Sequence, residues 1–243
     1  KEKRMNYEKL AGSIRAVIDR RPEDSGAYSD LFSLCREWEG EDFSAAHRVN
    51  RELLTLSADQ VRHGGGVKFY EQWRRGLLFE APHDFDSFMT YIELDRKPEK
   101  RFYAPRKHYL RPMVQGFQDV LDGKLRLLTI SMPKRAGKSQ TGINFVNMLS
   151  GKFPDRSTLM EGTGDDLVKS FYNGCLEYLT VPNEYLFYDV FPDARLIQTN
   201  ADSKTINLKS KSRFPTIMCR SIDARQVGLS EATNVLYLDD CVE

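Results

Sequence analysis

The residues best placed for chemistry lie in one short segment, where an apolar run leads into a loop and then into a helical pattern. The loop and the residue after it are Met132, Pro133, Lys134, Arg135, Ala136, Gly137, Lys138, Ser139 and Gln140. Gly137 allows a sharp turn and lets the backbone approach an anion closely. The first amides of a helix have no intrahelical partner, so they and the helix dipole favour phosphate. We therefore predict a phosphate-binding loop, with Lys138 on the terminal phosphates and Ser139 as a Mg²⁺ ligand.

The loop departs from the usual phosphate-binding pattern, because Met132 stands where the first glycine is expected. An alternative interpretation is an ordinary strand, turn and helix in which residues 137–139 only cap the helix. The surrounding pattern favours nucleotide binding. Residues 127–130 form an apolar run rich in strand formers, and Ile143 and Val146 recur at helical spacing. A buried strand, a tight loop and a helix in this order are typical of a loop that binds nucleotide phosphates.

Two carboxylates near the end of the chain supply the second half of an ATP site. Asp239 follows the apolar residues 235–238, which places it at the carboxyl end of a buried strand, where such sheets bind ligands. We expect Asp239 to hold Mg²⁺ through water and Asp240 to orient or deprotonate the attacking water, with Glu243 as the reserve candidate. The alternative is that paired aspartates simply end a strand in a turn. The two halves together predict binding and hydrolysis of ATP.

Hydrolysis also needs a cation for the charge that develops on the γ-phosphate. Arg135 inside the loop is one candidate, and Arg220 and Arg225, before the last strand, are others. The region before that strand is locally basic and contains Lys204, Lys209, Lys211, Arg213, Arg220 and Arg225. This stretch is either a patch for a DNA backbone or, because alternation along strands divides it, two separate solvated faces.

The composition says more about the cellular compartment of the protein than about its binding partner. The 243 residues carry a formal charge of +1, so any basic site must be a local patch. The 4 cysteines are widely spaced without a CxxC pair, which argues against zinc and favours reduced thiols in a cytoplasm-like compartment. No apolar run approaches the length of a membrane span.

Helical periodicity covers the first hundred residues, and strand and helix patterns alternate after them. The predicted organisation is a helical N-terminal region, residues 1–100, followed by an ATPase domain, residues 101–243. The alternation, with long crossovers, predicts an α/β P-loop NTPase fold of the ASCE type: a mainly parallel sheet with helices on both faces. Because a parallel-sheet domain rarely finishes at a strand such as 235–240, we expect a longer polypeptide beyond Glu243.

A basic and aromatic segment with three prolines, residues 97–112, precedes the loop region. One interpretation is a solvated connector. The other is a strap that stacks an aromatic ring, from Phe102, Tyr103 or Tyr109, on the adenine base. Both interpretations stay open from the sequence alone.

From about Tyr103 to its end, the chain resembles the large terminase subunits of tailed bacteriophages, the ATPase motors that package DNA into procapsids. Three segments carry the resemblance: VLDGKLRLLTISMPKRAGKS, STLMEGTGDDLVKSF and NVLYLDD. A Met-Pro-x-Arg-x-Gly-Lys-Ser loop, with an arginine and no first glycine, is typical of that family and more specific than a generic phosphate-binding loop. The resemblance implies an ATPase domain that precedes a nuclease domain absent from this chain.

The resemblance also implies roles and partners. Lys138 and Ser139 take the phosphate-loop roles, Arg135 is the loop arginine, and Gln115 or Gln118 stands near the adenine-recognition glutamine. Asp239 and Asp240 take the metal-binding and catalytic carboxylate roles. The implied partners are double-stranded DNA, a portal protein and a small terminase subunit. A homo-oligomeric ring would act at the procapsid portal in the host cytoplasm, without a membrane.

Two departures from the family pattern matter. Residues 228–231, GLSE, stand where many relatives carry an arginine-containing turn, so a trans-acting arginine finger must be a neighbour such as Arg225 or lie elsewhere. Relatives often have Asp-Glu where this chain has Asp239-Asp240, which leaves the catalytic carboxylate between Asp240 and Glu243. Two alternatives remain: a helicase-like or other nucleic-acid-stimulated ATPase, and a nucleotide-binding assembly module that does not hydrolyse.

Overall fold

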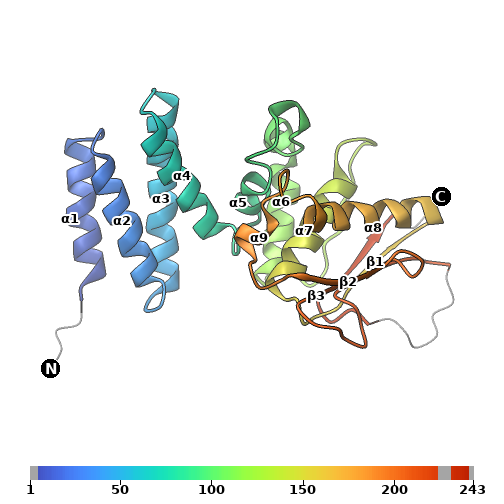
Figure 1. Ribbon diagram of the computed structural model, residues 1–243. Coiled ribbons are helices and arrows are strands. Elements are labelled where there is room, and N and C mark those ends of the chain that lie inside the picture. Colours follow the sequence, from blue (N-terminus) through green and yellow to red (C-terminus); the bar gives the residue numbers. More distant parts are fainter. Residues whose placement is uncertain (1–4, 224–230, 241–243) are drawn as a thin grey trace. The chain divides into compact units, whose positions relative to one another are not determined.

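The computed structural model describes residues 5–223 and 231–240, and its contacts divide the chain into two compact units (Figure 1). The first unit is Lys1–Glu80 and the second is Ala81–Glu243. Residues 81–100, which we assigned to the helical N-terminal region, belong to the second unit by their contacts. Within the described residues, no helix combines the length and the apolar character that crossing a membrane requires.

Four helices build the first unit: α1 (Tyr7–Arg20), α2 (Ser25–Trp38), α3 (Phe43–Arg62) and α4 (Val67–Glu80). The first three begin behind Asn6, Asp24 and Asp42, whose side-chain oxygens accept hydrogen bonds from first-turn amides. Gly64 and Gly66, both with positive φ, separate α3 from α4. These caps and glycines mark the ends and starts of helices where the apolar periodicity predicts separate helices.

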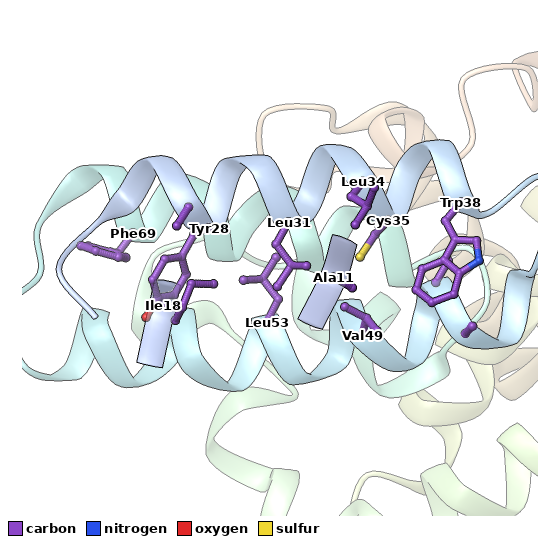
Figure 2. Packing of buried hydrophobic residues seen from close by; sticks show 13 residues of the cluster. Ala11, Ile18, Tyr28, Leu31, Leu34, Cys35, Trp38, Val49, Leu53 and Phe69 are labelled. Carbon is purple, nitrogen blue, oxygen red and sulfur yellow. The ribbon is translucent and has the colours of Figure 1, made fainter. Parts of the chain in front are cut away.

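The apolar faces of these helices meet in one hydrophobic core (Figure 2). Ile18 of α1, Tyr28 and Leu31 of α2, and Leu53 of α3 are each 1% exposed. Phe69 of α4 meets the Tyr28 ring edge-on, with ring centroids 5.0 Å apart. Full burial of one such aliphatic side chain contributes roughly 1.5–3 kcal/mol, so this core can stabilise a small helical unit.

A buried ion pair lies within the first unit. The His47 imidazole of α3 contacts Glu80 Oε1 through Nδ1 at 3.0 Å and Glu39 Oε1 through Nε2 at 3.2 Å. The Glu80 carboxylate also accepts a hydrogen bond from Asn50 Nδ2 at 2.8 Å. Burial lowers the pKa of His47, but the hydrogen bonds and charges of Glu80 and Glu39 outweigh it, and the pKa is raised above its ordinary 6.5.

The second unit is built on five strands: β1 (Thr158–Gly162), β2 (Leu196–Asn200), β3 (Thr205–Leu208), β4 (Ile217–Ser221) and β5 (Val235–Asp239). Their order is β2-β3-β4-β1-β5. β1 pairs in parallel with β4 and β5, whereas β3 pairs antiparallel with β2 and β4. The predicted ASCE-type P-loop fold with a mainly parallel sheet is therefore wrong, because this sheet is mixed. The physical reason is loop length: residues 201–204 and 209–216 are too few for a parallel crossover.

The predicted cover of helices on both faces of the sheet is also wrong. Helices α7 (Lys138–Lys152) and α8 (Asp165–Thr180) contact each other on one face of the sheet, where α8 packs on β4 and β1 and α7 packs on β5 (Figure 1). From that face, Cys175 Sγ of α8 lies 3.6 Å from Met160 Sδ of β1. On β5, Leu236 and Leu238 are 49% and 50% exposed. No helix among the described residues covers these two apolar side chains.

Residues 81–121 support α7 through aromatic packing. Helices α5 (Phe85–Tyr91) and α6 (Lys107–Leu121) are joined through two 3₁₀ turns, Pro98–Lys100 and Ala104–Arg106, and a short helix, α9 (Phe187–Val190), follows α8. The Phe85 ring meets the rings of Phe117 and Phe145 edge-on, with centroids 5.7 and 5.3 Å apart. This cluster fixes α7, which carries the loop residues at its start.

The strand predicted before the loop does not form. Leu128 and Ile130 are half-buried while Leu127 is 81% exposed, so burial alternates with the period of a strand. The backbone of residues 126–131, however, makes no hydrogen bond to any other described residue. Leu128 packs against Gly116 of α6, where an added Cβ would lie 3.0 Å from Leu128 Cδ1. Helix α6 therefore packs against the inward side chains of residues 126–131, while the backbone of this segment stays unpaired among the described residues.

Candidate active site

The loop ends in a tight turn that delivers Lys138 to the first turn of α7. Gly137 lies in the left-handed region with φ 98°, and the helix begins directly after it. The amides of Lys138, Ser139 and Gln140 have no hydrogen-bond partner among the described residues. The first bond is from Thr141 N to Gly137 O, at 3.0 Å. These amides and the positive end of the helix dipole favour an anion.

Four polar side chains meet beside this helix end: Lys138, Ser139, Asp239 and Asp240. Lys138 Nζ lies 2.7 Å from Asp239 Oδ1 and 2.8 Å from Asp240 Oδ1. Ser139 Oγ donates a hydrogen bond to Asp239 Oδ2 at 2.6 Å. Strand β5 ends at Asp239 and so carries both carboxylates to the loop, across a sequence separation of 100 residues. The structure thus brings together residues that the sequence assigned to one site.

The two aspartates differ in environment. Asp239 is 2% exposed, whereas the Asp240 side chain is 65% exposed. Hydrogen bonds to Asp239 and then to Asp240 raise the pKa of the Lys138 ammonium, although partial burial lowers it. Lys138 is therefore a cation at neutral pH. The enclosed carboxylate suits a fixed ligand, and the exposed one suits contact with solvent water.

Two further contacts hold these two aspartates, and the sequence analysis missed both. The Tyr237 hydroxyl donates to Asp239 Oδ2 at 3.5 Å, and Thr163 Oγ1 donates to the backbone carbonyl of Asp240 at 2.8 Å. Thr163 follows β1 directly, and its neighbour Gly162 is in register with Asp239 of β5. The parallel pairing of β1 and β5 would have predicted the Thr163 contact, had that pairing been known.

The aromatic segment before α6 packs onto the loop. An added Cβ on Gly137 would lie 2.8 Å from Phe102 Cζ, so the phenylalanine ring covers the glycine closely. The Glu93 carboxylate accepts hydrogen bonds from the amides of Phe102 and Tyr103, each within 3.0 Å. The Arg106 guanidinium lies 5.1 Å from the centroid of the Phe102 ring. The segment is therefore packed at Phe102 and Tyr103, while most of its other residues are exposed. The sequence analysis missed Glu93 and Arg106.

The other two aromatic candidates in this segment lie in different surroundings. Tyr103 is 1% exposed and its hydroxyl donates to Asp86, so its ring is part of the core. Tyr109 is 39% exposed on α6. Phe102 is therefore the ring of this segment that lies against the loop.

The predicted glutamines lie on two helices, Gln115 and Gln118 on α6 and Gln140 on α7. Gln118 accepts a hydrogen bond from Phe85 N at 2.7 Å and donates to His83 O at 3.0 Å, which ties α6 to the start of α5. Gln115 donates to Asp119 at 3.1 Å. Along α6, Gln115 and Gln118 are roughly 14 and 18 Å beyond Arg106 at the rise of an α-helix. Gln140 donates to the Tyr178 hydroxyl at 3.2 Å.

The candidate arginines are not gathered at the carboxylates. Arg135 is exposed in the loop with φ 63°. Arg220 of β4 lies 3.7 Å from the Glu161 carboxylate of β1, an ion pair along the sheet. Arg225 and Glu243 lie outside the described residues. Of the remaining loop residues, Pro133 O accepts from Ala136 N at 3.2 Å, Met132 is half-buried, and Lys134 is exposed.

The donor set fits a hard cation. Mg²⁺ prefers oxygen ligands, and the Ser139 hydroxyl and the Asp239 carboxylate present two kinds of oxygen within hydrogen-bonding distance of each other. Lys138 adds a fixed positive charge beside them, which favours an anionic phosphate at the same site. Comparisons of the chain with protein-family models, with curated proteins and with solved structures find no match.

Proposed function

We propose that this chain is a Mg²⁺-dependent ATP hydrolase whose active site is formed by the loop, the start of α7 and the end of β5. One observation carries the proposal: Ser139 and Lys138, at the start of a helix, both contact Asp239, at the end of a strand. A lysine and free amides for phosphate, beside a serine and a carboxylate for the metal, are the groups that phosphoryl transfer needs.

Each residue in the proposed site has a separate task. Lys138 and the amides of α7 bind the terminal phosphates. Ser139 and Asp239 would hold Mg²⁺, which supplies charge neutralisation on the phosphate oxygens when bound. Asp240 accepts a hydrogen bond from the attacking water and takes its proton, since its carboxylate side chain is 65% exposed to solvent. Phosphate binding exchanges one anionic partner of Lys138 for another, so the ammonium is positioned before the ligand arrives.

The larger role proposed for this activity is the translocation of double-stranded DNA into a procapsid, and it rests on the resemblance to large terminase subunits. A ring of subunits on a portal protein, with a small terminase subunit, would use ATP hydrolysis to move DNA. Arg135, exposed in the loop, is the cation proposed for the γ-phosphate in this scheme. DNA-stimulated release of phosphate by a longer chain would support the motor role. Stimulation by single strands with duplex separation would favour a helicase-like ATPase instead.

A titration of Mg-ATP by calorimetry tests the site itself. The parent chain should bind saturably, and Lys138→Ala should bind at least about tenfold more weakly, because a hydrogen bond to a charged group contributes about 1.5–3 kcal/mol. Lys169→Ala, which removes an exposed lysine of α8, is the matched control and should bind like the parent. Unchanged binding by Lys138→Ala would refute the assignment.

Asp240→Asn separates hydrolysis from binding. It should bind Mg-ATP like the parent and release phosphate far more slowly, because the amide does not take a proton. The alternative of a non-hydrolysing module has one observation in its favour: both aspartates hold Lys138 in ion pairs. Binding without any phosphate release, in the parent and with DNA present, would support that module.

A further inference from the structure

A pocket of about 360 Å³ lies at the carboxyl end of α7, and all of its lining residues belong to the second unit. Three of the apolar residues that line it, Val190, Phe191 and Ala194, are buried. The Phe191 ring packs so closely on Gly151 of α7 that there is no room for a Cβ. The last residue of α7, Lys152, therefore lies beside this apolar lining and forms part of the pocket wall.

Lys152 differs in its surroundings from the other lysine of the pocket, Lys209. Lys209 Nζ lies 2.7 Å from a carboxylate oxygen of Asp155, which holds it as a cation. Lys152 Nζ instead donates a hydrogen bond to the backbone carbonyl of Pro82 at 2.7 Å and lies 3.1 Å from His83 Nδ1. Among the described residues, no carboxylate oxygen lies within ion-pairing distance of Lys152 Nζ. The amine is thus held in place without a negative charge beside it.

The surroundings of Lys152 favour the neutral amine. Burial lowers the pKa of Lys152 below its ordinary value, and the charge of Asp122 offsets this only in part. For Lys209 the direction is opposite, because the hydrogen bond and the charge of Asp155 raise its pKa. A desolvated lysine without an ion pair is the kind of lysine that acts as a nucleophile towards carbonyl compounds. Of the two lysines in this pocket, Lys152 therefore has the surroundings of a nucleophile.

We propose that Lys152 forms an imine with a small, uncharged aliphatic aldehyde that binds in this pocket, with His83 as the proton carrier. The lining determines the class of ligand. Its buried residues are apolar and suit an aliphatic chain, whereas its charged residues Asp193 and Lys209 are exposed. The volume of about 360 Å³ lies near the lower end of the range for ligand pockets, about 300–1,000 Å³, so the ligand is small. This inference does not depend on ATP binding or hydrolysis.

The reaction balances without an oxidant or a reductant. The nitrogen lone pair of Lys152 attacks the carbonyl carbon, so that a C–N bond forms while the carbonyl π bond breaks. His83 Nδ1, 3.1 Å from Nζ, takes a proton from the nitrogen and passes it to the carbonyl oxygen. The oxygen then leaves as water and a C=N bond forms. Both hydrogens of the neutral amine leave in that water molecule.

Reductive alkylation of the full chain with butanal and cyanoborohydride at neutral pH tests the proposal. Cyanoborohydride reduces each imine to a stable secondary amine, and mass spectrometry of peptides gives the rate of alkylation at each lysine. Lys152 should be alkylated several times faster than Lys209 and than Lys169, an exposed lysine of α8. The rate at Lys152 should level off as the butanal concentration rises, because the aldehyde binds first, whereas the rate at Lys169 should stay proportional to it. Alkylation of Lys152 no faster than that of Lys169, or without saturation, would overturn the proposal.

Two variants test the roles of the two residues. His83→Gln keeps a polar side chain that does not carry a proton, so it should slow the alkylation of Lys152 several-fold. Lys152→Arg keeps a donor for the Pro82 carbonyl and should lose the saturable alkylation altogether. Lys209, in the same pocket, should keep its rate in both variants, which distinguishes a loss of chemistry at Lys152 from a loss of the fold. An unchanged rate at Lys152 in His83→Gln, or saturable alkylation that persists in Lys152→Arg, would contradict the proposal.

Discussion

The ion pair between Lys138 and Asp239 should determine the stability of the second unit as well as its chemistry. We consider the substitutions Lys138→Met and Asp239→Asn, alone and together. Lys138→Met leaves the Asp239 carboxylate, 2% exposed, without the ammonium that now lies 2.7 Å away. The Ser139 hydroxyl remains as a neutral donor at 2.6 Å, and it compensates only part of the lost charge.

The size of the effect follows from this burial. Removing one partner of a buried ion pair costs about 3–5 kcal/mol. The Lys138 side chain is 27% exposed, so the pair is partly solvated and the lower figure, about 3 kcal/mol, applies. For a unit of this size 1 kcal/mol lowers the melting temperature by about 2–4 °C, so Lys138→Met should lower it by roughly 6–12 °C. The double variant should lose less than the sum of the single variants, with a coupling free energy of about 2 kcal/mol.

Scanning calorimetry without nucleotide measures the melting temperatures of the parent, the two single variants and the double variant. Asp240→Asn is the matched control. The Asp240 side chain is 65% exposed, so its ion pair with Lys138 should contribute at most about 1 kcal/mol. Strict additivity of Lys138→Met and Asp239→Asn would refute the reasoning. A loss in Asp240→Asn as large as that in Asp239→Asn would refute it too. The same data show how far Lys138→Ala is destabilised before its nucleotide binding is interpreted.

Two further predictions concern the ion pair in the first unit and the glycine beneath Phe102. The folded-state pKa of His47 is raised above 6.5, so protonated His47 stabilises the first unit fully below about that pH, and the contribution is lost as pH rises through the folded pKa. Urea unfolding across this pH range should show the free energy of unfolding falling as pH rises. The variant His47→Gln should show a weaker pH dependence, and an unchanged slope of free energy against pH in this variant would contradict the assignment. Gly137→Ala combines φ 98° with a Cβ 2.8 Å from Phe102, whereas Gly123→Ala has φ 72° and open space. Both variants should lose about 1–2 kcal/mol of free energy of unfolding, because alanine disfavours the left-handed backbone conformation. Only Gly137→Ala should also weaken Mg-ATP binding. Equal Mg-ATP binding by the two variants would show that the Phe102 contact has no part in nucleotide binding.

Local chemistry was the part of the site that the sequence could predict. The turn at Gly137, the helix after it and the carboxylates at the end of an apolar strand depend on neighbouring residues, and the structure contains all three. The meeting of Ser139 with Asp239 was also predicted, because both patterns belong to one kind of phosphate site. Glu93 and Arg106 were missed, because an acid that caps a loop and an arginine beside a ring have no pattern of their own along the chain.

The sheet was predicted less well, because strand direction is not a local property. The strand predicted at residues 235–240 does form, as β5, and it pairs in parallel with β1. β2 was not recognised, and the two short connections around β3 that make the sheet mixed were not used in the prediction. Apolar periodicity indicates that a segment has a buried face, but it does not indicate which neighbouring strand pairs with the backbone of that segment.

Residues 126–131 show this limit most clearly, and they also show why the site forms without a strand in front of the loop. The geometry depends on α7, whose Gly142 lies so close to the Tyr237 ring that there is no room for a Cβ. This contact sets the start of α7 against the end of β5, and the Phe85, Phe117 and Phe145 cluster holds the helix from behind. The packing of α7 therefore brings Lys138 and Ser139 to Asp239 without a strand in front of the loop.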